Sequence, residues 1–230
     1  MQAEKARELA QVLAERYGVK VFGYGCDVSN LISVRTMVAD VLAEFGEINI
    51  LHNNAGGKSD DLDAFFAPFE EYSLDQWRKI MAVNLDGMFL VAQAIGKQMV
   101  EQGIGGSIIQ TASIYGVMAP DHRIYEGSFY LGRQINTPAV YTTSKAAVIG
   151  LTKHLATYWA EKGIRVNTLT PGGTESGQND EFKSRYSARI PVGRMANAPE
   201  MVGALLYLAS DASSYVTGQN IITDGGLNCW

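Results

Sequence analysis

The 230-residue sequence predicts an α/β fold, in which helices cover both faces of a doubly wound parallel sheet. Short apolar runs over 48–52, 107–112 and 164–170 alternate with helical patterns of ten or more residues, which favours parallel pairing. Several of these runs are apolar on both sides, as buried parallel strands tend to be. Because no repeat, low-complexity tract or linker interrupts the chain, we expect residues 1–230 to form a single domain.

The first part of the chain is expected to form two helices with a strand between them. Residues 2–17 carry apolar side chains at helical spacing, and Gly18 ends that helix. Residues 19–24 form the predicted strand. Ser29 is the predicted N-cap of the second helix, which continues to about Phe45.

Two long helices are predicted in the middle of the chain. The Ser73–Gln76 capping box begins a helix that ends near Gln102. Thr137 is the expected N-cap of a second helix over 138–162, whose first residue is proline. The other predicted elements are a helix over 199–209, a strand over 220–223 and loops over 53–72 and 114–136.

Composition and charge exclude several classes of protein. A net charge of −5 without a cluster of Lys and Arg argues against nucleic-acid binding. No apolar run reaches the ~20 residues of a membrane span, and the polar N-terminus lacks the apolar stretch of a signal peptide. Cys26 and Cys229 suggest no disulfide framework, and His122 has no second ligand at metal spacing. We therefore expect a cytoplasmic protein with no metal site and no nucleic-acid or membrane partner.

Tyr141 and Lys145 are the strongest chemical signal in the chain. They lie four residues apart on a predicted helix, so their side chains share one face. An ammonium beside a phenol stabilises the phenolate and lowers the pKa of the phenol, which suits a group that transfers protons. Ser113, at the end of the strand over 107–112, offers a hydroxyl nearby. The alternative is a helix with one exposed Tyr and one exposed Lys.

Together with Asn84, the turn Asn53-Asn54-Ala55-Gly56 and the segment Arg165-Val166-Asn167, these residues resemble the classical short-chain dehydrogenase/reductases over essentially the whole chain. The resemblance implies a Rossmann-like sheet, NAD or NADP as cofactor, and interconversion of an alcohol and a ketone by hydride transfer. It implies that Tyr141 is the acid/base and that Ser113 holds the substrate oxygen. Lys145 would assist Tyr141 and bind the nicotinamide ribose, and Asn84 would hold a relay water.

The resemblance also implies a set of cofactor-binding residues at the ends of strands: Asp27, Val28, Asn54, Ala55, Gly56, Tyr141, Lys145, Pro171, Gly172 and Thr174. Two of these assignments stay open. Asp27 is either a contact to the adenine or a plain helix cap. Thr174 and Ser176 are equal candidates for the bond to the nicotinamide carboxamide.

The 27 residues between Ser113 and Tyr141 are more than twice the usual length in this family. Together with segments such as Thr170-Pro-Gly-Gly, they resemble the sugar-modifying reductases of bacterial nonulosonic-acid and flagellin-glycosylation pathways. Arg123 and Arg133 fit a carboxylate or phosphate, so a sugar-like, anionic small molecule is the expected substrate. The alternative is a surface loop that contacts another subunit.

The resemblance begins at the family's second helix, so the fold is expected to be N-terminally truncated, with the first two strands and the glycine-rich phosphate turn absent. Two missing strands would leave a gap of roughly 10 Å between residues 19–24 and 48–52. The first strand would pair across it, another subunit would fill it, or the natural protein is longer, which is the outcome we favour. The residue that chooses between NAD and NADP belongs to the missing part.

Two other functions stay open. The chain would be an inactive truncated fragment that acts only as an oligomerisation or binding module, or an epimerase that uses the same Tyr–Lys pair. The resemblance further implies a homotetramer or homodimer, in which the helices over 73–102 and 138–162 form the interface.

Overall fold

A parallel sheet forms the centre of the computed structural model, which describes residues 3–230. Its strands are β1 (Ile50–Asn53), β2 (Gly106–Thr111), β5 (Ile164–Pro171) and β6 (Asn220–Thr223), in the order β1-β2-β5-β6. The register places Ile109 opposite His52 on β1 and Asn167 on β5. The predicted α/β class and parallel sheet are confirmed, with strand bounds within two residues of the predicted ones.

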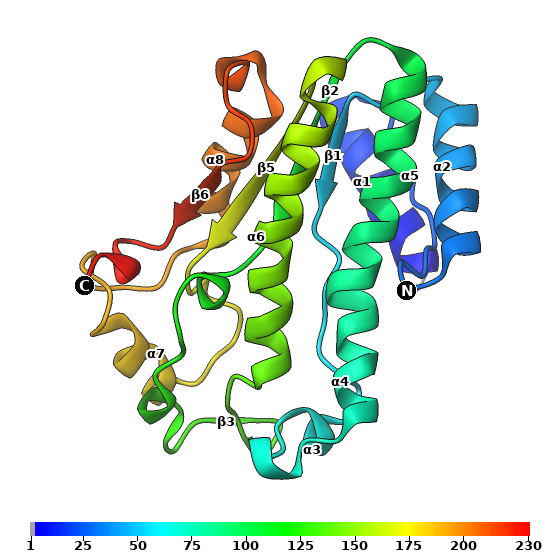
Figure 1. Cartoon of the computed structure of the whole chain (residues 1–230). Helices are drawn as coiled ribbons and strands as arrows, with labels where there is room; N and C mark the ends of the chain where they lie inside the picture. The colour runs from blue at the N-terminus through cyan, green and yellow to red at the C-terminus, as the bar shows by residue number, and fades with distance from the viewer. Residues whose placement is uncertain (1–2) are drawn as a thin grey trace.

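Helices pack on both faces of this sheet (Figure 1). In chain order, the helices of the described residues are α1 (Ala3–Tyr17), α2 (Leu31–Phe45), α3 (Leu62–Phe65), α4 (Leu74–Met81), α5 (Gly87–Gln102), α6 (Ala139–Trp159), α7 (Asp180–Ser187) and α8 (Val202–Ala209). Neighbouring residues of β2 show the double winding. Ile108 packs in a core with Val91 of α5 and Trp159 of α6, whereas Ile109 packs with Leu208 of α8. Successive strand side chains point to opposite faces, so each face buries its own helices.

The predicted helix over 73–102 forms as one continuous run with a π-helical turn, η2 (Ala82–Asp86), between α4 and α5. The Ser73 hydroxyl accepts a hydrogen bond from the Gln76 N–H, as the capping box predicts. By length and composition this run, Leu74–Gln102, could cross a membrane, with a mean hydropathy of 1.2. Ile95 and Met99 on it are buried against the sheet, as in a core helix.

The strand predicted over residues 19–24 is wrong. A strand needs a partner for its backbone, and this segment instead contacts helices. Lys20 makes an ion pair with Glu44, the Tyr24 hydroxyl donates to the Asp40 carbonyl, and Gly23 lies directly on α1. Within the described residues β2 is the only strand that pairs with β1.

Helix starts also differ from the prediction. Asn30, not Ser29, caps α2, because its side chain accepts from the N–H groups of Ile32 and Ser33. The helix predicted from Pro138 begins one residue later, with Pro138 as the cap residue of α6. The sequence pattern also missed the short helices α3 and α7.

The loop predicted over 114–136 contains local structure that packs inside the chain. It holds two 3-10 turns, η3 (Ile114–Gly116) and η4 (His122–Tyr125), and a hairpin of β3 (Phe129–Tyr130) and β4 (Arg133–Gln134). Ile124 and Tyr125 are buried in a cluster with Phe182 and Tyr186 of α7. The segment therefore forms one wall of the molecule at the carboxyl ends of the strands, where α3, β3 and α7 gather (Figure 1).

Candidate active site

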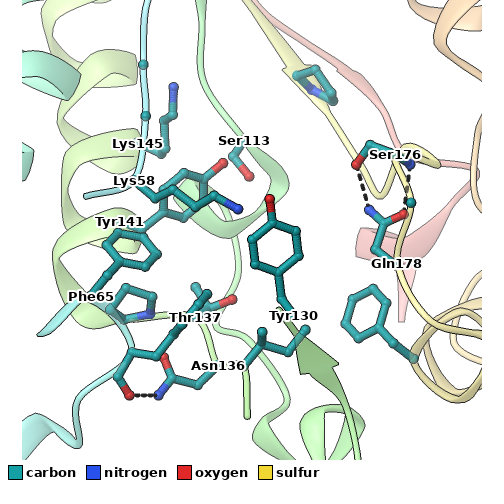
Figure 2. Close-up of a pocket in the computed structure, with 18 of the residues that line it drawn as sticks. Lys58, Phe65, Ser113, Tyr130, Asn136, Thr137, Tyr141, Lys145, Ser176 and Gln178 are labelled. Atoms are coloured by element: carbon teal, nitrogen blue, oxygen red, sulfur yellow. Dashed lines mark hydrogen bonds between the residues drawn. The ribbon is translucent and has the colours of Figure 1, made fainter. Parts of the chain in front are cut away.

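A cleft of about 770 Å³ lies at the carboxyl ends of β1, β2 and β5. The residues that follow each strand line this cleft. They are Asn54, Gly56, Gly57 and Lys58 after β1, Ala112 and Ser113 after β2, and Gly172 after β5. The start of α6 and the hairpin complete the walls (Figure 2). Ligands of doubly wound sheets bind at this edge, because the loops that leave the strands converge there.

Tyr141 and Lys145 meet in this cleft on the first turns of α6. Lys145 is only 5% exposed, and its Nζ donates to the Thr111 carbonyl at 3.0 Å. Burial lowers the pKa of Lys145 to about 8. Its Nζ lies 6.0 Å from the centroid of the Tyr141 ring.

The predicted direction for the Tyr141 pKa is wrong. Burial raises the pKa of the phenol above its ordinary value, and the neighbouring Ser113 hydroxyl offsets part of that rise. Removal from water disfavours the charged phenolate, and this burial is the largest cause of the shift. Tyr141 is therefore a protonated phenol at neutral pH.

Ser113 lies two residues after the end of β2 and is the N-cap of η3, with its Oγ accepting a hydrogen bond from the Tyr115 N–H at 3.3 Å. The next turn packs tightly on α6. A Cβ added to Gly116 would lie 2.6 Å from the Lys145 carbonyl carbon. The segment after β2 and the Lys145 turn of α6 are thus held together by a backbone contact that only glycine permits.

Asn84 lies in the π-helical turn η2 and is fully buried. Its Oδ1 accepts a hydrogen bond from the Gly57 N–H at 2.9 Å, and its Nδ2 has no partner among residues 3–230. A Cβ at Gly56 would lie 3.5 Å from Asn84 Oδ1 and 3.6 Å from Lys145 Nζ. The turn after β1 therefore lies beside both Asn84 and Lys145, and the Nδ2 donor suits a bound water.

A model of the short chain dehydrogenase family matches residues 1–187. The chain belongs to this family. The predicted resemblance is confirmed at that level, and with it the assignment of the chain as a short-chain dehydrogenase/reductase enzyme.

Several relatives of this dehydrogenase act on polyols. The D-threitol dehydrogenase of Mycolicibacterium smegmatis is 38% identical over 231 residues, which cover 98% of this chain and 80% of the relative. The NADP-dependent mannitol dehydrogenase of Alternaria alternata is 35% identical, over 97% of this chain and 78% of its own. The narrower resemblance to nonulosonic-acid and flagellin-glycosylation reductases stays a prediction.

Solved structures of similar proteins carry the predicted cofactors. A short-chain dehydrogenase from Leptospira borgpetersenii with bound NAD+ has a TM-score of 0.81 and 36% identity, over 92% of this chain and 77% of that one. A gluconate 5-dehydrogenase from Burkholderia cenocepacia, in complex with NADP and tartrate, has a TM-score of 0.85 and 34% identity. The match covers 99% of this chain and 82% of that one. The prediction of NAD or NADP is thus confirmed at the level of the family.

The cleft brings together most of the residues predicted to bind the cofactor or to act in catalysis. Those that line it are Asn54, Gly56, Ser113, Tyr141, Lys145, Pro171 and Gly172. Lys145 fits a nicotinamide ribose, since Thr111 O is its one acceptor within the described residues and its other N–H bonds stay free. Of the two candidates near residue 175, Ser176 lines the cleft, whereas Thr174 forms a bridge with Ala196.

Asp27, Val28 and Ala55 do not line the cleft. The Asp27 carboxylate accepts hydrogen bonds from the Ser29 N–H and hydroxyl, at 3.0 and 2.6 Å, which hold its pKa below the usual range. Val28 packs against Gly87 at the start of α5. These contacts give Asp27 a role in the turn before α2, and its part in binding adenine stays a prediction.

The sequence interpretation did not assign several lining residues to the site. Lys58, Tyr130, Asn136 and Gln178 line the cleft. Arg123 and Arg133, for which substrate recognition and a surface loop were both open, are absent from the lining and pair with Asp121 and Asp63. The one signal for Lys58 was its position just after the Asn53–Gly56 turn, at a strand end where ligands bind.

Proposed function

We propose that this chain interconverts an alcohol and a ketone on a sugar-like small molecule, with NAD or NADP as cofactor and Tyr141 as the acid/base. The observation that carries the proposal is the meeting of Ser113, Tyr141 and Lys145 in one cleft at the strand ends. The polyol dehydrogenases among the relatives support the substrate class. When bound, the nicotinamide would supply or accept the hydride.

The protein's own contribution follows from the state of each group. The raised pKa keeps the Tyr141 phenol protonated, so it can give its proton to a carbonyl oxygen during reduction. Lys145, with a pKa of about 8, is a cation at pH 7 and stabilises the phenolate that remains. The Ser113 hydroxyl can hold the same oxygen, and Asn84 Nδ2 can hold a water that returns the proton.

Binding of the cofactor and turnover are separate tests of this function. Purified chain is titrated with NADH and NADPH while nicotinamide fluorescence is followed, and then assayed with polyols, ketoses and aldonates. Tyr141→Phe should keep the cofactor affinity and lower kcat by about a thousandfold, because only the transferable proton is lost. A variant with near wild-type kcat would exclude Tyr141 as the acid/base. Absence of cofactor binding would instead favour a binding module.

The proposal also includes an oligomeric state and a cellular location. We infer a homodimer or homotetramer, supported by the exposed aromatic residues Phe89 on α5 and Tyr158 on α6, which light scattering can test. We also infer a cytoplasmic location, supported by the acidic composition.

A further inference from the structure

The charges that line the cleft all have one sign. Lys58 and Lys145 line it, and no Asp or Glu of the described residues does. Lys145 is buried and committed to Tyr141 and Thr111. Lys58 is therefore the one cation of the described lining residues that stands outside the catalytic set.

Lys58 has a defined position without a carboxylate partner. Its Nζ lies 3.5 Å from the centroid of the Tyr130 ring, and no Asp or Glu of the described residues lies within ion-pair distance. The neighbouring Gly57 N–H donates a hydrogen bond to the side chain of Asn84, so the backbone before Lys58 is fixed to a buried residue. A ring face attracts an ammonium but leaves N–H donors for a ligand.

Other polar groups that line the cleft can form hydrogen bonds with the hydroxyls of a substrate. Asn136 lines the cleft and its Nδ2 donates to the Phe66 carbonyl at 2.8 Å, whereas its buried Oδ1 has no partner in the part of the chain that the structure describes. An unpaired buried acceptor of this kind is satisfied when a ligand hydroxyl donates to it. Figure 2 shows the Lys58 amine and the Tyr130 hydroxyl directed into the same space below Ser113.

We propose that Lys58 binds a carboxylate or phosphate on the substrate, so that the cleft takes acidic sugar derivatives in preference to neutral polyols. This inference rests on the proposed function and names its substrate class. Arg123 and Arg133, the cations that the sequence suggested for this purpose, are already neutralised by Asp121 and Asp63. Lys58 lies in the same cleft as the proposed catalytic groups, and its positive charge is available to an anionic substrate.

The test compares three six-carbon ligands of different charge: D-glucitol, D-gluconate and D-glucitol 6-phosphate. Calorimetry measures their dissociation constants with and without saturating NAD(P)+, and kinetics measures kcat/KM for each. Wild type should bind at least one of the anions more tightly than glucitol. Lys58→Met should lower the anion-to-glucitol ratio of affinities by about tenfold or more, as the loss of a charge-assisted hydrogen bond does. Gluconate and the phosphate separate the two possible anions.

Matched variants separate charge from packing. Lys58→Arg keeps the charge and should retain most of the anion preference. Lys153→Met makes the same change of net charge on an exposed part of α6 and should leave the ratio unchanged. Tyr130→Phe keeps the ring beneath Lys58 and should retain the anion preference.

Three results would overturn the proposal. They are equal losses for all three ligands in Lys58→Met, a wild type that prefers glucitol to both anions, or an effect confined to the KM of the cofactor. Failure of the proposed function has a different signature. In that case no alcohol is oxidised with either cofactor, while calorimetry still reports whether anions bind through Lys58.

Discussion

Two parts of the cleft differ in how they are built. The floor, formed by Asn84, Ser113 and Lys145 with Tyr141, lies at the ends of β2, on α6 and in the turn between α4 and α5. The first three side chains are 0%, 8% and 5% exposed. The rim, formed by Lys58, Tyr130 and the hairpin around Arg133, is exposed and lies on connecting segments. Proton transfer needs fixed distances and dry surroundings, whereas recognition of a substrate needs access from solvent.

This difference has an energetic consequence. A buried Lys145 is available for chemistry only because the fold holds a cation out of water, with one carbonyl as its acceptor. The rim has no such cost, since its charges are solvated. Changes to the floor should therefore alter stability as well as catalysis, whereas changes to the rim should alter substrate binding with little effect on stability.

The largest expected effect comes from Lys145→Met, which removes the buried charge. Activity should fall by about a thousandfold, because the phenolate of Tyr141 loses its stabilising cation. Stability at pH 7 should rise by up to about 3 kcal/mol, the equivalent of a pKa that falls from 10.5 to about 8 on folding.

The pH dependence tests the cause of that gain. Below pH 8 both folded and unfolded wild type carry the proton, so wild type bears the full cost of burial. Between pH 8 and 10.5 the unfolded state binds more protons than the folded state, so wild type gains stability as pH rises. The difference in unfolding free energy between Lys145→Met and wild type therefore becomes smaller. Urea unfolding at pH 7 and pH 9.5 measures this difference. A variant less stable than wild type at pH 7 would show that packing and the Thr111 hydrogen bond outweigh burial of the charge.

A smaller effect is expected from Gly116→Ala, which changes the spacing within the floor. The new Cβ would meet the Lys145 carbonyl carbon at 2.6 Å and the Ala146 nitrogen at 2.9 Å, so η3 and α6 must move apart. We expect a loss of about 1–3 kcal/mol in unfolding free energy, together with a fall in kcat.

Gly150→Ala on the same helix is the control for this change. Its Cβ would meet nothing within 4 Å, so alanine should stabilise α6 by about 0.5–1 kcal/mol. Thermal unfolding and kcat are measured for both variants. Equal behaviour of the two would show that the contact between η3 and α6 does not position the floor.

The floor was predictable from sequence and the rim was not, for physical reasons. Tyr141 and Lys145 sit on a long helix, and helical spacing alone places them on one face. Ser113 lies just after a strand that the sequence predicts. Tyr130 and Asn136 reach the cleft through the hairpin, whose position depends on buried contacts such as Tyr125 with Phe182, far along the chain. Local patterns carry no information about such contacts.

The same reason explains the wrong strand over residues 19–24. Its apolar alternation is real, yet a strand exists only where a neighbouring backbone pairs with it. Phe22 instead packs edge-on against Phe45, and Lys20 contacts Glu44, so α2 takes the place of a strand neighbour. The raised pKa of Tyr141 was missed because burial, unlike the spacing to Lys145, is a property of the whole fold.

The smallest expected effect, Arg133→Ala, separates charge from support at the rim. Arg133 Nη2 donates to Asp63 Oδ2 at 2.9 Å and links the hairpin to α3, with both side chains largely exposed. Such a pair is screened by water, so its loss should raise KM by at most about threefold. The rise should be the same for glucitol and gluconate, because Arg133 does not line the cleft. Asp63→Ala should reproduce it, and the double variant should add little, since each single change already breaks the pair. A selective loss of gluconate in Arg133→Ala would move the anion site from Lys58 to the hairpin and break the division between a reactive floor and a selective rim.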